Sequence, residues 1–286
     1  MSTRGIHPVR FAMAVTVVLA LNLLFLARSP VGAAPQEAAA TQAPPSLTLE
    51  QQEAFLLKAK IVRTRGASKG VTNTLRATLS DGAVTHDASI QTIDEFMTEF
   101  KSNRGTEFNF RDTWRYNVAA YRLDRLLELN MIPPSVERNY LSKPGSFTWW
   151  VDDVIMDEAE RLKTKVAAPN ALAWNEQMWH VRLFDQLIYN VDRNLGNLVI
   201  DKTWTIWMID HTRAFRLFDK IKTPTNLSRI DRKVYDRLKA LDPDKLKTVM
   251  GDYLTGPEIR AMLARRDDIV ARLDKMGATA LFDRAK

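Results

Sequence analysis

The chain has 286 residues, of which 45% are hydrophobic and 26% are charged, a composition typical of a globular protein with a sizeable core. The formal net charge is +7, but Arg4, Arg10 and Arg28 lie in the first 33 positions, which contain no acidic residue and leave +4 for the rest. This mild excess, without a basic stripe interleaved with aromatic residues, predicts no nucleic-acid partner. The absence of cysteine excludes disulfides, thiol catalysis and Cys-ligated zinc.

The N-terminal segment, residues 1–33, has the pattern of a secretory signal peptide. Arg4 and Arg10 precede an uncharged apolar stretch over 11–27, and the small residues of 31–33 follow it. The alternative is an uncleaved membrane anchor, because seventeen residues approach the length of a bilayer span. Both interpretations predict an exported protein, periplasmic or secreted in a bacterium and in the secretory-pathway lumen in a eukaryote. Membrane contact is expected only through such an anchor.

Residues 34–46 are rich in Ala, Pro and Gln and predict a flexible linker. The remainder, 47–286, predicts one domain with an N-lobe at about 47–151 and a C-lobe at about 152–286. Its expected elements, in chain order, are a helix over 49–60, strands over 71–79 and 84–93 around an Asp81-Gly82 turn, a helix over 112–130 capped by Asp112, strands over 136–140 and 146–151, a helix over 170–190, strands over 198–200 and 205–209, and helices over 228–242, 243–253 and 255–276. Strands concentrated in the first half and helices in the second predict an α+β fold with two lobes.

A polar motif follows the helix expected over 170–190. It reads Asp192-Arg-Asn-Leu-Gly-Asn197, and a short hydrophobic run then ends at Asp210. An Asp, an Asn five residues later and an Asp thirteen residues further on match the catalytic loop and metal-binding aspartate of kinase-type phosphoryl transfer. The alternative is a plain turn, because Asn, Asp and Gly also favour tight turns.

Four segments in chain order carry a resemblance to a known family. They are Trp114-Arg-Tyr-Asn-Val-Ala-Ala-Tyr-Arg-Leu-Asp-Arg125, Asn130-Met-Ile-Pro-Pro134, Phe184-Asp-Gln-Leu-Ile-Tyr-Asn-Val-Asp-Arg193 and Ile209-Asp210. Over about 60–215 the chain resembles the atypical kinases of the secretory pathway (Golgi casein kinase and xylosylkinase types) and, more remotely, phosphatidylinositol kinases and HipA. The segments are similar to helix C, its exit toward the hinge, the helix into the catalytic loop, and the metal aspartate of those proteins.

The resemblance implies a two-lobed protein-kinase-like fold, with one long helix in a strand-rich N-lobe and a mostly helical C-lobe. It also implies roles for individual residues. Asp192 would face the acceptor hydroxyl, while Asn197 and Asp210 would hold the Mg²⁺ or Mn²⁺ ion that bridges the phosphates of ATP. Carboxylate and amide oxygens are suitable ligands for these hard cations.

The sequence departs from the kinase pattern where a strand lysine and a helix C glutamate are expected. Gln91 stands at the lysine position and Asn117 at the glutamate position. Replacing one partner alone would leave an unpaired buried charge, at a cost of about 3–5 kcal/mol, whereas two amides form a neutral pair that can hydrogen-bond. Lys69, in the loop over 66–70, is the candidate substitute cation, although an exposed loop lysine is the simpler interpretation. Gln91, Asn117 and Lys69 are therefore the candidate nucleotide-binding residues.

These patterns predict a metal-dependent, ATP-using phosphotransferase that acts on a hydroxyl group of a protein or glycan. Two alternatives remain open. One is an exported pseudokinase that acts as a binding or regulatory module, favoured by Gln91 and Asn117. The other is a nucleotidyl (AMP) transferase that uses the same metal-binding residues.

Overall fold

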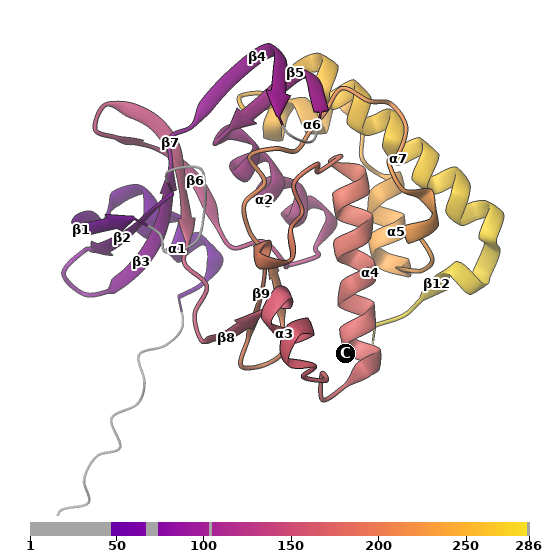
Figure 1. Cartoon of the computed structure of the whole chain (residues 1–286), viewed down its shortest axis with the longest axis horizontal. Coiled ribbons are helices and arrows are strands. Elements are labelled where there is room, and N and C mark those ends of the chain that lie inside the picture. The colour runs from indigo at the N-terminus through magenta and orange to yellow at the C-terminus, as the bar shows by residue number, and fades with distance from the viewer. Residues whose placement is uncertain (1–46, 67–73, 103–104, 285–286) are drawn as a thin grey trace, which may run out of the picture. The chain divides into compact units, whose positions relative to one another are not determined.

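The structure is a computed structural model that describes residues 47–66, 74–102 and 105–284 (Figure 1). Residues Ser46–Lys286 form one compact unit. The predicted signal segment at 1–33 and linker at 34–46 lie outside the described residues, as does Lys69. Within the described ranges, no helix combines the length and the apolar character that crossing a membrane requires.

An antiparallel five-stranded sheet follows the first helix, α1 (Leu49–Lys58). Thr48 begins this helix with a capping box, in which its hydroxyl accepts from the Gln51 backbone and the Gln51 side chain accepts from the Thr48 backbone. The strands, in spatial order, are β1 (Lys60–Gly66), β2 (Leu75–Ser80), β3 (Thr85–Gln91), β7 (Lys143–Trp149) and β6 (Ser135–Tyr140).

The two faces of this sheet differ in polarity, because successive side chains of a strand point to opposite faces. Leu79, Ile90 and Phe147 are buried with Phe55 and Leu56 of α1 in a small hydrophobic cluster. The opposite face presents amide and hydroxyl side chains, namely Gln91 and Ser89 of β3, Thr148 of β7 and Ser135 of β6. This polar face forms the roof of the pocket described below.

A long hairpin precedes the second helix and was not predicted. It consists of β4 (Asp94–Ser102) and β5 (Gly105–Thr113), and Asp112 pairs with Glu95 across it. The expectation that Asp112 caps a helix over 112–130 is therefore wrong. The helix α2 (Arg115–Leu127) begins after Trp114, whose backbone N–H donates to the carbonyl of Ile93 at the hairpin base (2.8 Å).

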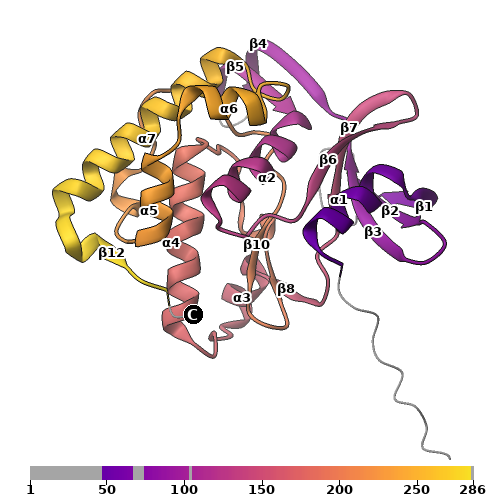
Figure 2. The same ribbon diagram turned by 180° about the vertical axis from the view of Figure 1, so that it is seen from behind.

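The rest of the chain is mostly helical (Figure 2). It contains a three-stranded antiparallel sheet, in the order β10-β9-β8, and helices that pack on one another. The elements are β8 (Val154–Asp157), α3 (Glu158–Thr164), α4 (Ala171–Leu187), the 3₁₀ turn η1 (Leu195–Asn197), β9 (Leu198–Asp201), β10 (Ile206–Met208), η2 (Pro224–Asn226), β11 (Ile230–Asp231), α5 (Arg232–Lys239), α6 (Pro243–Met250), α7 (Gly256–Met276), η3 (Gly277–Ala280) and β12 (Leu281–Phe282). The helix expected over 228–242 is shorter because Ile230 and Asp231 pair in parallel with Leu281 and Phe282.

Two hydrophobic clusters divide the described residues into lobes. The smaller lies between α1 and the five-stranded sheet, and the larger fills the helical part. Helix α2 contributes Val118, Leu123 and Leu127 to the larger cluster. The Tyr116 hydroxyl also bonds to Glu258 of α7, and Arg122 Nη1 donates to the carbonyl of Val249 (2.5 Å). Helix α2 therefore packs on the helical lobe, although β6 and β7 of the five-stranded sheet follow it in the chain.

Candidate functional site

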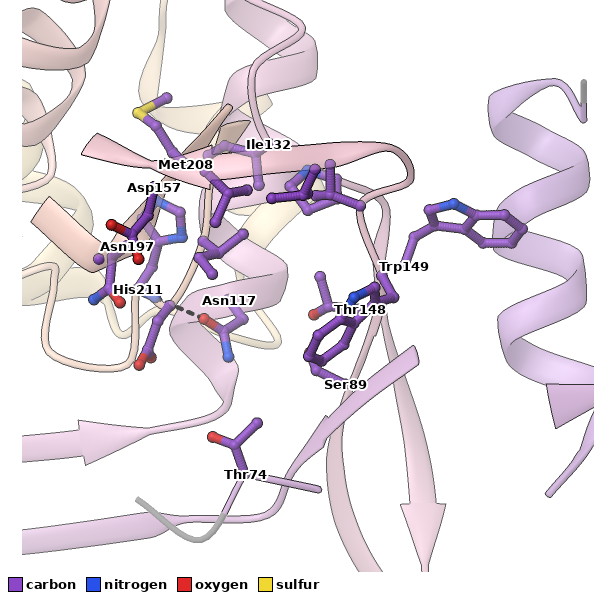
Figure 3. Close-up of a pocket in the computed structure, with 18 of the residues that line it drawn as sticks. Thr74, Ser89, Asn117, Ile132, Thr148, Trp149, Asp157, Asn197, Met208 and His211 are labelled. Carbon is purple, nitrogen blue, oxygen red and sulfur yellow. Dashed lines mark hydrogen bonds between the residues drawn. The ribbon is translucent and has the colours of Figure 1, made fainter. Parts of the chain in front are cut away.

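A pocket of about 630 Å³ lies between the polar face of the sheet and the helical lobe (Figure 3). Five of the six predicted site residues line it: Gln91, Asn117, Asp192, Asn197 and Asp210. Its other described lining includes an apolar floor with Ile132, Val199 and Met208. The tertiary structure therefore brings together residues that are up to 119 positions apart in the sequence.

The loop that carries Asp192 begins where α4 ends. Asn190 accepts the backbone N–H of Asp192 on its side-chain oxygen (3.0 Å), an Asx turn of the type that Asn favours. The backbone then tightens into η1, in which the N–H of Asn197 donates to the carbonyl of Asn194 (3.1 Å). The N–H of Ile209 donates to the carbonyl of Asn197 (3.0 Å), so Asn197 and Asp210 are held on adjoining segments.

Arg193, inside the motif, holds this arrangement together, a role that the sequence analysis did not assign. Its Nε donates to both carboxylate oxygens of Asp185 on α4 (3.1 and 3.0 Å), and its Nη1 donates to the carbonyls of Asn197 (3.1 Å) and Ile209 (2.9 Å). The rigid fork of a guanidinium suits this work better than a lysine would. Arg193 thereby ties the helix, the loop and the strand end that precedes Asp210.

His211, which follows Asp210, is a packed and uncharged residue. Arg193 Nη2 donates to His211 Nε2 (2.9 Å), and since a guanidinium has no acceptor, the imidazole nitrogen is the acceptor. Complete burial, reinforced by the Arg193 charge, holds the pKa of His211 well below its ordinary value. The neutral ring therefore supports the loop, and we assign it no proton-transfer role.

Gln91 and Asn117 form a direct hydrogen bond. The side-chain amide Nδ2 of Asn117 donates to Gln91 Oε1 (2.5 Å) and to Ser146 Oγ (3.1 Å). The side-chain oxygen of Asn117 accepts the backbone N–H of His211 (2.8 Å), which Figure 3 marks. Both side chains are about 4% exposed, so these bonds satisfy polar groups that burial would otherwise penalise.

Asp210 is held by the same network. Gln91 Nε2 donates to Asp210 Oδ1 (3.3 Å) and to Thr74 Oγ1 (3.0 Å), while Thr212 Oγ1 donates to the same Asp210 oxygen (3.3 Å). The backbone of Asp210 has φ of +55°, in the left-handed region that non-glycine residues rarely occupy. Such a conformation costs about 1–3 kcal/mol and persists where surrounding contacts maintain it, often at a functional site.

No protein-family model matches the sequence, and none of the curated proteins matches it. Solved structures do match. The structure of hydra Fam20 with sugar aligns with a TM-score of 0.62 at 15% identity, covering 83% of this chain and 93% of that chain. The Golgi casein kinase with Mn/ADP bound gives 0.54 at 13% identity, covering 82% and 78%. The Helicobacter pylori proinflammatory kinase CtkA gives 0.53 at 11% identity, covering 78% and 98%.

This chain has an atypical kinase-like fold. The predicted resemblance and the α+β, two-lobed fold class are confirmed. In this kinase-like fold, the pocket lies between the lobes. At these sequence identities the likeness concerns the fold, so the chemistry of the site rests on this chain's own residues.

The pocket of this kinase-like fold is acidic. Among the lining residues that the structure describes are four carboxylates, those of Asp157, Glu160, Asp192 and Asp210. Arg76, on the neighbouring strand β2, binds Asp87 (2.6 Å) and lies over the Trp150 ring (4.1 Å). The predicted cation Lys69 falls outside the described residues.

The donor set fits a divalent cation that is shared with a bound ligand. Asp210 and Asn197 offer hard oxygen ligands, the kind that Mg²⁺ and Mn²⁺ prefer. The described residues contain no group of three or more His, Cys, Asp or Glu side chains that could hold a metal by themselves. Mg²⁺ usually takes one or two carboxylates and completes its shell with waters and substrate phosphates, and that is the arrangement these residues suit.

Asp157 and Glu160 are pocket residues that the sequence analysis missed. Asp157 caps α3, accepting the Glu160 backbone N–H on Oδ1 (2.8 Å), and is 8% exposed. Its other oxygen, Oδ2, would lie 4.0 Å from a Cβ placed on Gly196 of the loop. An Asp followed by acidic residues in the next turn is a helix-start signal that could have located α3. Its proximity to the loop could not be read from the sequence.

Proposed function

We propose that this protein is a phosphotransferase that binds ATP with Mg²⁺ or Mn²⁺ in the pocket between the lobes and transfers a phosphoryl group to a hydroxyl. One observation carries the proposal. Asp192, Asn197 and Asp210 have the order and spacing of a kinase catalytic loop and metal aspartate, and all three line the same pocket. The kinase-like fold of the chain supports it.

Each residue has a distinct role in this proposal. Asp192 orients the acceptor hydroxyl and accepts its proton, a contribution of about 10²–10⁴-fold for a positioned base. Asn197 and Asp210 hold the divalent cation, which, when bound, neutralises charge on the phosphates. Arg193 and the Gln91–Asn117 pair keep these side chains in place before the ligand arrives, and such preorganisation lowers the barrier of the chemical step.

The lysine of an ordinary kinase supplies a positive charge that Gln91 does not. The Gln91 amide offers N–H donors, which already bind Thr74 and Asp210. Charge compensation for the phosphates therefore falls to the divalent cation, with Lys69 as the candidate cation from the protein. The proposal implies that nucleotide binding depends strongly on metal, because four carboxylates line the described part of the pocket.

The second candidate is a pseudokinase, a binding module without catalytic turnover. The neutral Gln91–Asn117 pair favours it, since the two amides replace an ion pair that clamps nucleotide phosphates in active kinases. Both candidates place the protein outside the cytoplasm, on the strength of the predicted export signal. The acceptor, a protein or a glycan hydroxyl, is part of the proposal.

Thermal unfolding with ATP plus Mg²⁺ or Mn²⁺ tests the proposal. Ligand at about 100 times its Kd adds about 2.7 kcal/mol to the free energy of unfolding, a shift of several degrees. We expect the shift in the wild type, its loss in Asp210→Ala, and its retention in the control Asp267→Ala, whose exposed carboxylate pairs with Arg266. Absence of a shift with any nucleotide would overturn the phosphotransferase proposal.

Label transfer separates the remaining candidates. Once nucleotide binding is established, incubation with ATP labelled on the γ-phosphate tests phosphoryl transfer. Incubation with ATP labelled on the α-phosphate tests AMP transfer. We expect γ-label in acceptor hydroxyls and its loss in Asp192→Ala. Nucleotide binding without transfer of either label would establish the pseudokinase, and transfer of the α-label would establish the nucleotidyl transferase.

A further inference from the structure

The segment that follows Asp210, residues 211–216, lies between the β4–β5 hairpin and the catalytic loop. On the hairpin side, the N–H of Thr113 in β5 donates to the carbonyl of Thr212 (3.0 Å). On the loop side, the N–H of Phe215 donates to the carbonyl of Ile188 (2.5 Å), and the N–H of Val191 donates to the carbonyl of Arg213 (3.4 Å). We call residues 211–216 the bridging segment, because it contacts both.

One carboxylate of the hairpin binds two arginines of the bridging segment. Glu107 Oε2 pairs with Arg213 Nη2 (2.5 Å), and Glu107 Oε1 pairs with Arg216 Nη2 (2.5 Å). Arg216 Nη2 also donates to the carbonyl of Phe108 (3.4 Å), and the Arg213 guanidinium lies over the Phe110 ring (4.4 Å). These contacts come from Glu107, Phe108 and Phe110 of β5, so this strand holds both arginines of the bridging segment.

Burial makes this contact different from an ordinary surface ion pair. The Arg216 side chain is 4% exposed, and burial lowers the pKa of its guanidinium. Arg213 is 21% and Glu107 30% exposed. Two neighbouring arginines repel each other, and among the described ion pairs Glu107 supplies the carboxylate for both. Removing that charge leaves two part-buried cations side by side, which favours separation of the segment from the hairpin.

Arg213 connects the hairpin to the reacting groups. Its side chain binds Glu107, while its backbone carbonyl accepts the N–H of Val191, the residue before Asp192. Thr212, the residue before Arg213, donates its hydroxyl to Asp210. Movement of the bridging segment would therefore shift both the proposed base and the proposed metal ligand, although Glu107 touches neither.

We propose that Glu107 is a positioning residue that, through Arg213 and Arg216, keeps Asp192 and Asp210 in the geometry needed for phosphoryl transfer. This inference rests on the proposed function for its catalytic consequence. In this proposal, the β4–β5 hairpin holds the bridging segment, which follows Asp210, in place.

The test uses the isosteric change Glu107→Gln, with Glu107→Asp as a variant that retains the charge. Glu128→Gln is the matched control: the same substitution removes a carboxylate that pairs with Arg237 on α5, outside the pocket. The first measurement is amide hydrogen exchange. In Glu107→Gln we expect faster exchange at Val191, Phe215 and Thr113, whose N–H groups bond across the bridging segment, and no such change in the control.

The second measurement is Mn²⁺·ATP affinity and turnover. In Glu107→Gln we expect kcat to fall by about five- to tenfold, typical of energetic coupling between sites, with partial recovery in Glu107→Asp and wild-type values in Glu128→Gln. A uniform loss of stability without a change in kcat would show a merely structural role. If Glu107→Gln unfolds, Glu107→Asp carries the comparison.

The outcomes separate this inference from the proposed function. Wild-type exchange rates at Val191 and Phe215 in Glu107→Gln would overturn the positioning role, whether or not the protein binds nucleotide. Wild-type kcat in Glu107→Gln would also overturn it while leaving the proposed function intact. A wild type that binds no nucleotide would instead overturn the proposed function, and faster exchange would then still support the mechanical link.

Discussion

Asn117 on α2 donates its side-chain amide to Gln91 on β3, and these are the two residues predicted from the sequence at the positions of the kinase glutamate and lysine. The pair continues to Ser146 on one side and to Asp210 on the other. Every hydrogen bond of this network joins neutral groups, apart from the one to the carboxylate of Asp210. At the pocket, the lobes are therefore connected by hydrogen bonds between amide, hydroxyl and carboxylate groups.

We expect the two amides to be coupled energetically. Asn117→Glu alone introduces a buried carboxylate without a cation and should lower the free energy of unfolding by about 3–5 kcal/mol. Gln91→Lys alone should cost less, because Asp210 is within hydrogen-bonding reach of that side chain. The double variant should recover part of the loss. Urea denaturation of the four proteins gives the coupling energy, and strictly additive effects would contradict the pairing.

Arg193 should be irreplaceable by lysine. A lysine retains the charge but cannot donate at once to Asp185, Asn197 and Ile209. We expect Arg193→Lys to lower the free energy of unfolding by about 1–3 kcal/mol and to weaken Mn²⁺·ATP binding. Arg237→Lys, which alters a surface ion pair with Glu128, is the control. Equal effects of the two substitutions would argue against a special role for Arg193.

Gly145 lies where β7 passes closest to Gln91. A Cβ at this position would lie 2.6 Å from the Gln91 carbonyl oxygen and 2.9 Å from Thr92 Cγ2, so the strands would have to move apart. We expect Gly145→Ala to destabilise the fold by about 1–3 kcal/mol and to weaken nucleotide binding through Gln91. Gly66→Ala, where a Cβ would meet nothing within 4 Å, is the control for the effect on stability. A wild-type melting temperature in Gly145→Ala would contradict the crowding.

Acid should destabilise the protein partly through His180. Burial, reinforced by the charge of Arg284, lowers the pKa of His180 to about 4 from its ordinary 6.5. Because the folded-state pKa is the lower one, the unfolded chain binds the proton first, and stability falls as the pH decreases from about 6.5 toward 4. The full effect is of the order of 3 kcal/mol.

Urea denaturation between pH 7 and pH 4 measures this contribution. We expect His180→Gln to show a shallower loss of stability with falling pH than the wild type, although it lowers stability at pH 7. His86→Gln is the control, because His86 lies on β3 beside the exposed carboxylate of Asp152, far from the His180 environment of Trp179 and Phe282. Identical pH slopes for His180→Gln and the wild type would contradict the assignment.

The predicted catalytic-loop motif could be found from the sequence because its residues lie close together in the chain. Asp192, Asn197 and Asp210 lie within nineteen positions, after a helix whose apolar pattern and Asn170 cap are visible in the chain. The same holds for α1 and for the β2–β3 hairpin, which follow from residue type and order. The start of α2 was predicted too early in the chain, because Asp112 pairs with Glu95 in the β4–β5 hairpin instead of capping the helix.

Residue type and order along the chain were enough to predict the two-lobed fold and the residues of the candidate site. The tertiary structure alone decided how they are held. The bond from Gln91 to Asp210 spans 119 positions, that from Arg213 to Glu107 spans 106, and Asp157 approaches Gly196 from a separate sheet and helix. Periodicity and capping report on neighbours a few residues apart, whereas these contacts depend on how two lobes with separate hydrophobic clusters pack against each other.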